Sequence, residues 1–129
     1  MTIVYGIPNC DTVKKARAWL AIRDIPHEFH DFKKHGVPAG KLPVWAHAVG
    51  WDKLLNRKGT TWRKLDAASL ASAQTPEGAM ALALLSPSVI KRPVVEWGAG
   101  ALRRVARNSA LIDVTVGFDE LLWTQTVAT

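Results

Sequence analysis

The chain contains a single cysteine among its 129 residues, and this scarcity excludes two classes of protein. One thiol, Cys10, cannot form an internal disulfide, so the chain is not a small secreted scaffold held together by disulfides. A dithiol redox centre is also excluded, because Val13 stands where a Cys-x-x-Cys motif would place the second thiol. The chain has four histidines, His27, His30, His35 and His47. They lack metal-ligand spacing with the cysteine, so we expect no metal site.

Long apolar runs are absent as well. No run approaches the roughly 20 residues that span a bilayer, and no basic segment followed by an apolar one marks a secretory signal. A Gly-rich phosphate loop and a Ser-His-Asp pattern are also missing. Hydrophobic residues nevertheless make up 48% of the chain, which is enough for a buried core. We therefore expect one cytoplasmic domain over residues 1–129, with no membrane partner.

Acidic residues are fewer than basic ones, 11 against 17, which gives a net charge of +6. The sequence pI is about 9.8. This balance suits anionic partners, either nucleic acid or small anions. The basic residues are spread over several short segments and no single run dominates. A solvated basic surface is therefore the simpler interpretation, and nucleic-acid binding is not expected.

The first part of the chain shows the pattern strand, helix, strand. Residues 2–5 are a short β-branched and aromatic run, which predicts a buried strand. Residues 11–24 carry apolar side chains at helical spacing, with Asn9 or Asp11 available as the N-cap. Residues 27–32 alternate in polarity and predict a second strand. Such a unit forms a parallel pair of strands with a right-handed crossover.

The middle of the chain, about residues 40–86, has a different character. Short helix-like segments are separated by glycine, proline and threonine. Asp66 and Thr75 are predicted N-caps, and Pro76 suits a first helical position. We therefore expect a helical insertion here.

Strands return in the last part of the chain. Residues 94–97 and 111–116 are predicted strands, and residues 118–125 are a predicted last helix. The intervening residues 98–110 form either a loop or, over 101–106, a further strand. The order is thus β-α-β, a helical block, then β-β-α. It predicts an α/β, thioredoxin-like fold with a mixed four-stranded sheet and a helical insertion between the two halves.

Cys10 stands where the first strand ends and the first helix begins. A helix N-terminus offers unpaired N–H groups and about half a positive charge, and both favour a thiolate. Lys14, one turn further on, adds a full charge near the same end, so the position suits a nucleophile. The alternative is an inert core residue, as many free cysteines are. A one-thiol site needs a second thiol from outside, most simply from glutathione.

Five segments together resemble the arsenate reductase–Spx family, and most closely its small YffB-type members. The segments are "YGIPNCDTVKKARAWL", "FHDFKKHG", "LLNRKGTTWRKL", "PSVIKRPVVE" and "VGFDE". Each is weak alone, but their combination in this order is specific and covers roughly residues 3–120. The resemblance implies a thioredoxin-like fold with a helical insertion, which agrees with the order of elements.

The resemblance also implies roles for individual residues. In arsenate reductases of this family, one cysteine attacks the oxyanion, arginines hold the anion, and glutathione and glutaredoxin complete the cycle. Cys10 matches that cysteine, while Arg92 and Arg57 lie in segments that supply arginines, whose planar forks suit carboxylates and oxyanions. Pro93 matches a cis-proline opposite the cysteine, which leaves the preceding backbone free to pair with a bound thiol substrate. From the residues alone, a trans-proline at the start of an edge strand is the alternative.

The segment "NRKGTTWRK", residues 56–64, combines basic side chains, hydroxyls and an indole. Thr60, Thr61 and Arg63 suit the binding of a carboxylate or a phosphate, with Trp62 shaping the edge of the site. A plain surface loop is the alternative interpretation. The resemblance favours a binding site.

The sequence departs from arsenate reductases in two places. The sequence of the cysteine loop, "CDTVKKA", is typical of the YffB-type branch, so arsenate is not the expected substrate. The connection before "VGF" is longer than usual, over about residues 98–110. A third anion-binding arginine therefore has three candidates, Arg103, Arg104 and Arg107.

We therefore predict a glutathione-dependent thiol reductase in which Cys10 forms a mixed disulfide. The predicted substrate-binding residues are Arg92, Arg57, Thr60, Thr61, Arg63 and Pro93. No bound cofactor is expected; glutathione is a co-substrate and glutaredoxin a partner. Two alternatives remain: an arsenate reductase with the same partners, and a non-catalytic Spx-like regulator that binds RNA polymerase.

Overall fold

A computed structural model describes residues 2–98 and 114–126 of the chain. The chain divides into two compact units, which are described separately. The first unit comprises Met1–His35 and Arg92–Thr129, and the second comprises Gly36–Lys91. The predicted insertion, about residues 40–86, lies inside the second unit. The prediction of a single domain stays a prediction.

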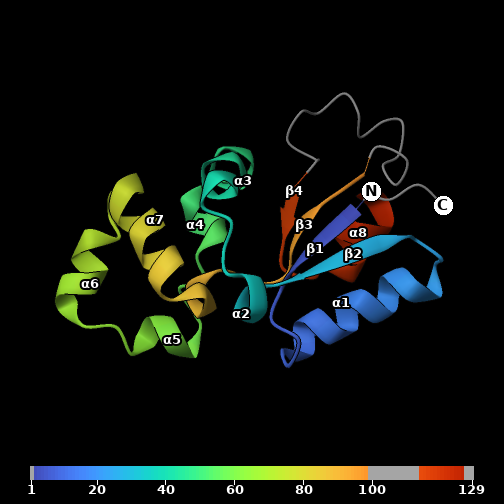
Figure 1. Ribbon diagram of the computed structural model, residues 1–129, viewed down its shortest axis with the longest axis horizontal. Helices are drawn as coiled ribbons and strands as arrows, with labels where there is room; N and C mark the ends of the chain where they lie inside the picture. The colour runs from blue at the N-terminus through green and yellow to red at the C-terminus, as the bar shows by residue number, and fades with distance from the viewer. Residues whose placement is uncertain (1, 99–113, 127–129) are drawn as a thin grey trace. The chain divides into compact units, whose positions relative to one another are not determined.

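The first unit is built on a mixed four-stranded sheet, as the sequence predicts, and its strand order is β2-β1-β3-β4 (Figure 1). The strands are β1 (Thr2–Gly6), β2 (His27–Asp31), β3 (Val94–Glu96) and β4 (Val114–Val116). β1 and β2 are parallel, while β3 is antiparallel to both β1 and β4. The helices of this unit are α1 (Asp11–Ile22), α2 (Phe32–His35) and α8 (Glu120–Thr126). This is the mixed sheet of a thioredoxin-like α/β fold.

One face of the sheet carries the apolar core that fixes α1 against it. Val4 of β1 and Val95 of β3 share this face and are fully buried. They pack with Leu20 of α1 and Trp123 of α8 in one buried cluster. Burial of large apolar side chains is the main stabilising term of such a core. The sheet and α1 therefore form a firm base for the loop that joins β1 to α1.

Gly6 allows the end of β1 to approach α1 closely. A Cβ atom at this position would lie 2.9 Å from Cγ2 of Val13, closer than such atoms pack. Val13 is itself fully buried, so it has little room to give way. Glycine is therefore required for the short connection that carries Cys10.

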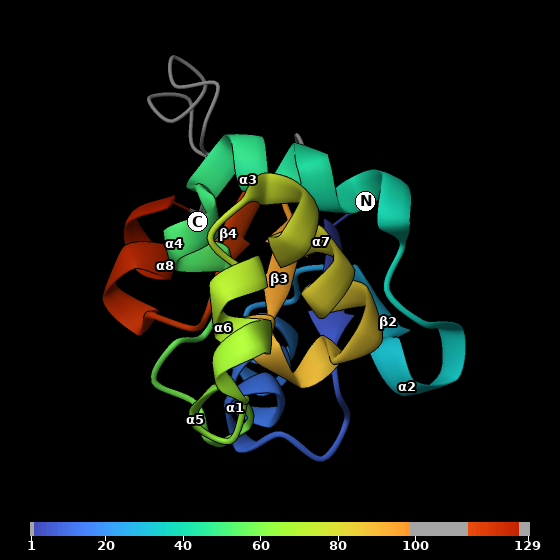
Figure 2. The same cartoon turned by 90° about the vertical axis from the view of Figure 1, so that its left-hand side faces the viewer.

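The second unit is helical. Its helices are α3 (Leu42–Val49), α4 (Trp51–Leu54), α5 (Thr60–Arg63), α6 (Ala67–Ser72) and α7 (Pro76–Leu85), with 3₁₀ turns at Ala39–Lys41 and Pro87–Val89. Figure 2 looks onto α6 and α7, which lie side by side. Both predicted N-caps are confirmed: Asp66 accepts a hydrogen bond from the N–H of Ser69 at 2.7 Å, and Thr75 accepts one from Gly78 at 3.1 Å. Pro76 occupies the first position of α7, as predicted.

Two segments of the second unit run antiparallel beside each other. The N–H of Asn56 donates to the carbonyl of Val89 at 2.7 Å, and the N–H of Lys91 donates to the carbonyl of Leu54 at 2.8 Å. A β-bridge between Leu55 and Ile90 lies between these bonds. The loop that follows Leu55 is thereby fixed to the segment that leads into Arg92.

The N-cap of α1 differs from the prediction. Cys10, rather than Asn9 or Asp11, is the N-cap residue: its backbone is extended, and no side-chain hydrogen bond caps the helix. The carbonyl of Cys10 accepts the N–H of Lys14 at 3.0 Å, which is the first bond of the helix. The cysteine therefore lies closer to the helix end than the sequence argument placed it.

The ends of several other elements also differ: β1 ends at Gly6 and α1 ends at Ile22, where the sequence predicts residues 5 and 24. β2 ends at Asp31, because its carboxylate accepts the N–H of Lys33 at 2.8 Å and turns the chain into α2. β3 ends at Glu96, and α8 begins at Glu120, two residues after the predicted start. β4 begins at Val114, and the rest of the predicted strand lies outside the described residues, as does the segment 99–113. Within the described ranges, no helix is both long and apolar enough to cross a bilayer.

Candidate active site

Cys10 is held at the N-terminus of α1 by its own backbone. Its N–H donates to the carbonyl of Ile7 at 3.2 Å, which closes the turn after β1. Its carbonyl accepts the first helical bond, so its side chain lies beside the free N–H groups of the first turn of α1. The thiol is half-buried, and it is therefore accessible to a substrate while partly shielded from water.

The surroundings of Cys10 lower the pKa of its thiol. Burial alone raises this pKa, but hydrogen bonds from the backbone N–H of Val13, from the Arg92 side chain and from the N–H of Thr12 outweigh it. The positive charge of Arg92 acts in the same direction. The pKa of Cys10 consequently lies below its ordinary value, which increases the thiolate fraction at neutral pH.

The peptide bond between Arg92 and Pro93 is cis, as the family resemblance implies. Pro93 is buried, and its carbonyl accepts the N–H of Gly117 at 2.9 Å, so the turn is tied to the end of β4. Arg92 is half-buried and reaches the sulfur of Cys10. The structure thus brings the Arg92 side chain to Cys10 in the first unit, and Pro93 follows Arg92 across the cis bond.

The cation beside the sulfur is Arg92, whereas the sequence argument assigned that charge to Lys14. Lys14 is exposed on α1, and its recorded contact with Cys10 is the backbone hydrogen bond of the first helical turn. The backbone donors of Thr12 and Val13 were not named from the sequence either. The sequence did predict that a helix begins here, and the first N–H groups of any helix lack partners within the helix. That rule could have identified both donors.

The other predicted binding residues lie in the second unit. Arg57 follows α4, and Nη2 of Arg57 lies 3.0 Å from Oδ1 of Asp52. The guanidinium carbon of Arg57 lies 5.6 Å from the centre of the Trp62 ring. Thr60, Thr61 and Arg63 form α5 with Trp62. Thr60 and Arg63 are exposed, and Thr61 is half-buried.

Asp52 is a member of this second group that the sequence analysis missed. It stands five positions before Arg57, across the end of α4 and the following turn, so no helical spacing rule pairs the two. The predicted site therefore consists of two clusters. Cys10, Arg92 and Pro93 form the cysteine cluster, and Asp52, Arg57 and Trp62 form the arginine cluster beside α5.

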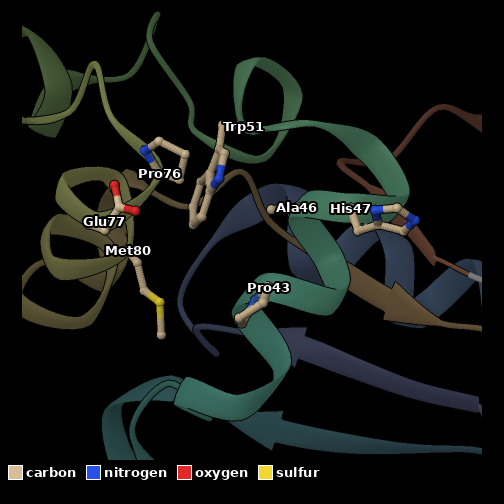
Figure 3. Close-up of a pocket in the computed structure, with 7 residues that line it drawn as sticks. All are labelled: Pro43, Ala46, His47, Trp51, Pro76, Glu77 and Met80. Carbon is tan, nitrogen blue, oxygen red and sulfur yellow. The ribbon is translucent and has the colours of Figure 1, made fainter.

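A cavity in the second unit contains none of the predicted site residues. It has a volume of about 360 Å³ and lies among α3, α4 and α7 (Figure 3). Trp51, Pro76 and Met80 give it a mostly apolar lining, and Glu77 is its acidic member. It offers no nucleophile or cluster of cationic groups, so it does not contribute to the proposed chemistry. Within the described residues, no group of three or more His, Cys, Asp or Glu side chains is placed to hold a metal ion.

Comparison with known proteins gives a consistent result. A family model described as the ArsC family matches residues 5–120. An uncharacterized protein of Haemophilus influenzae is 41% identical over 95 residues, which cover 74% of this chain and 82% of that protein. A solved structure of a YffB protein is 39% identical, with a TM-score of 0.83 over 99% of this chain and 100% of that one.

Two further relatives bear on function. The solution structure of an arsenate reductase (ArsC) related protein from Brucella melitensis is 39% identical, with a TM-score of 0.67 over 95% of this chain and 90% of that one. The global transcriptional regulator Spx of Listeria monocytogenes is 27% identical over 99 residues, which cover 74% of this chain and 72% of the regulator. This chain is therefore similar to proteins whose names describe different roles.

Proposed function

Because this chain belongs to the ArsC family, we propose that it is a glutathione-linked thiol reductase whose nucleophile is Cys10. The observation that carries the proposal is the environment of the sulfur. Backbone donors of α1 and the Arg92 guanidinium surround a half-buried thiol and lower its pKa. A purely structural cysteine has no need of such donors.

In the first step, the Cys10 thiolate attacks the glutathione sulfur of a substrate–glutathione mixed disulfide. The disulfide bond between the glutathione sulfur and the substrate sulfur breaks, the substrate leaves as a thiolate that takes a proton from water, and a Cys10–glutathione disulfide forms. In the second step, the thiolate of another glutathione attacks this disulfide. Oxidised glutathione leaves and the Cys10 thiolate is restored, so each turnover consumes one free glutathione, and the glutathione taken from the substrate forms the other half of the oxidised product. Glutaredoxin is the alternative donor in this second step.

The donors around Cys10 serve both steps. In the first step they raise the fraction of thiolate available for attack. In the second step they stabilise Cys10 as a leaving group, because a thiol with a lower pKa leaves faster. Arg92 contributes a charge-assisted hydrogen bond, which is stronger than a neutral one.

We assign the recognition of the carboxylates of glutathione to Arg57, Thr60, Thr61 and Arg63. The support is chemical: a guanidinium fork and hydroxyl groups suit carboxylates, and the exposure of Arg57 leaves it accessible to a ligand. Trp62 stacks near Arg57 and limits its orientations. Glutathione is abundant where thiols are kept reduced, so we place the protein in the cytoplasm.

Reduction of arsenate is a second candidate function, supported by the Brucella relative that is described as arsenate reductase related. The Cys10 thiolate and the Arg92 guanidinium would there meet a tetrahedral oxyanion. Arsenate-dependent turnover with glutathione and glutaredoxin measures this activity directly. Turnover that depends on arsenate, without turnover of glutathionylated substrates, would replace our proposal by this one.

A non-catalytic role is the third candidate, supported by the Spx relatives. In that case the chain would bind RNA polymerase and its cysteine would be dispensable for binding. Retention of purified RNA polymerase by the wild type and by Cys10→Ser alike, without any reductase turnover, would favour this role.

The proposed activity is tested by turnover of a glutathionylated peptide with glutathione as the reductant. The wild type should release the free peptide and form oxidised glutathione in equal amounts. Mass spectrometry should detect a Cys10–glutathione adduct when the peptide is supplied without free glutathione. Absence of both the turnover and the adduct would refute the proposal.

A further inference from the structure

An acidic side chain lies directly against the arginine that we assign to glutathione recognition. Asp52 is in the first turn of α4, and its Oδ1 lies 3.0 Å from Nη2 of Arg57. The centre of the Trp62 ring lies 5.6 Å from the central carbon of the same guanidinium. A carboxylate of a bound ligand and the carboxylate of Asp52 are acceptors of the same kind, so they compete for the same donors.

The exposure of the pair shows that this contact can be exchanged. The Asp52 side chain is 86% exposed and that of Arg57 is 43% exposed. A pair so open to water contributes little to the stability of the fold, because solvent screens it and both side chains lose rotamer freedom. The Asp52 carboxylate is already largely hydrated in the pair, so its displacement into water costs little free energy. The guanidinium keeps its neighbour Trp62, so its position is still restricted.

We propose that Asp52 is a specificity-determining residue of the anion site: it occupies Arg57 in the free protein and is displaced by the carboxylate of the incoming ligand. This inference rests on the proposed function for the identity of the ligand. Asp52 thereby reduces the occupancy of Arg57 by weakly bound anions such as chloride or acetate. A ligand must offer further contacts, as a tripeptide with two carboxylates does, to displace it.

The direction in which neutralisation of Asp52 changes the anion affinity distinguishes a competing role from a structural one. If Asp52 is a competitor, its neutralisation removes a negative charge beside an anion site and tightens anion binding. If Asp52 instead holds Arg57 in its binding orientation, neutralisation weakens anion binding. The expected change for Asp52→Asn is about two- to fivefold tighter binding of glutathione, the range that an exposed ion pair supports.

The experiment is a titration of the full chain with glutathione, followed by the backbone and arginine Nε–H resonances in NMR spectra. Asp52→Asn is compared with Glu77→Gln, which makes the same change in net charge at an exposed residue of α7. We expect tighter binding for Asp52→Asn and unchanged binding for Glu77→Gln. In an Arg57→Ala background, Asp52→Asn should have no effect, because the competition has been removed.

Three results of the glutathione titration would overturn the inference: weaker binding by Asp52→Asn, a change no larger than that of Glu77→Gln, or a gain that persists without Arg57. Inorganic phosphate serves as a second probe that separates this inference from the proposed function. If glutathione shifts no resonance but phosphate shifts the Arg57 Nε–H signal more strongly in Asp52→Asn, the proposed function fails and the role of Asp52 stands. If neither anion shifts that signal in any variant, the inference fails as well.

Discussion

The cysteine cluster and the arginine cluster each contain an arginine, but the two arginines differ in burial and in their neighbours. Arg92 is half-buried and is placed by a buried proline that is tied to the end of β4. Arg57 lies on a loop, partly exposed, and is balanced by an exposed carboxylate. A charge acts more strongly where water is excluded, so Arg92 can alter the pKa of a neighbouring group. Arg57 is instead accessible and weakly held, which suits reversible binding. In the function proposed above, the first unit supplies the reactive thiol and the second unit supplies the groups that bind the anion.

The largest effect should come from Cys10→Ser, which removes the nucleophile and leaves both arginines. Turnover of a glutathionylated peptide should fall to the background rate, because a serine hydroxyl is not ionised at neutral pH and forms no disulfide. Glutathione should still bind, since the contacts of its carboxylates remain. Residual enzymatic turnover in this variant would place the chemistry elsewhere.

Arg92→Ala should have the next largest effect, and it should act on reactivity. Loss of a charge-assisted hydrogen bond costs about 1.5–3 kcal/mol. We therefore expect kcat/KM to fall by about one to two decades, with the thiol pKa raised. Arg92→Lys should recover part of the loss, because it keeps the charge without the planar fork. Normal reactivity of Cys10 in Arg92→Ala would remove the electrostatic distinction between the clusters.

Arg57→Ala should weaken glutathione binding by about tenfold, an effect on affinity alone. The pKa and the alkylation rate of Cys10 should be unchanged, because the groups that act on the sulfur belong to α1 and to Arg92. Calorimetric titration measures the first quantity and iodoacetamide labelling the second. If Arg57→Ala changed the labelling rate of Cys10 as much as Arg92→Ala does, both arginines would control the reactivity of the thiol, and the distinction between the clusters would be lost.

A smaller and purely structural effect is expected from Thr75→Ala, which removes the N-cap of α7. The free energy of unfolding should fall by about 1 kcal/mol, with labelling of Cys10 unchanged. Urea unfolding followed by circular dichroism gives the first value. This variant is the stability control for the arginine variants, since a labelling defect here would mean that loss of stability alone affects the sulfur.

The sequence predicts many elements of both units because their signals are local. The strand pattern before Gly6, the helical spacing after Asp11 and the N-caps Asp66 and Thr75 each depend on neighbours in the chain, and the structure contains all of them. The resemblance supplied the cis bond before Pro93, which the residues alone did not favour.

The remaining features of the site depend on contacts that no local pattern encodes. The pairing of Cys10 with Arg92 joins residues 82 positions apart through the sheet, so only the fold reveals which cation reaches the sulfur. The Asp52–Arg57 pair crosses a turn whose geometry follows from backbone bonds between two distant segments. The candidates Arg103, Arg104 and Arg107 lie outside the described residues, so their role stays a prediction.

The central claim is that Cys10 is a thiolate stabilised by α1 and Arg92, and the pH dependence of its alkylation tests this most directly. Because the pKa of Cys10 is lowered in the folded chain, its thiolate stabilises the fold fully above the pKa of the unfolded thiol, and this contribution is lost as the pH falls through the folded-state pKa. The alkylation rate of the wild type should therefore reach half its maximum below the value of about 8.5 of an unperturbed thiol. The midpoint should rise in Arg92→Ala and stay in place in Arg57→Ala. A wild-type midpoint at or above that of a model peptide would contradict the claim and make Cys10 a structural residue.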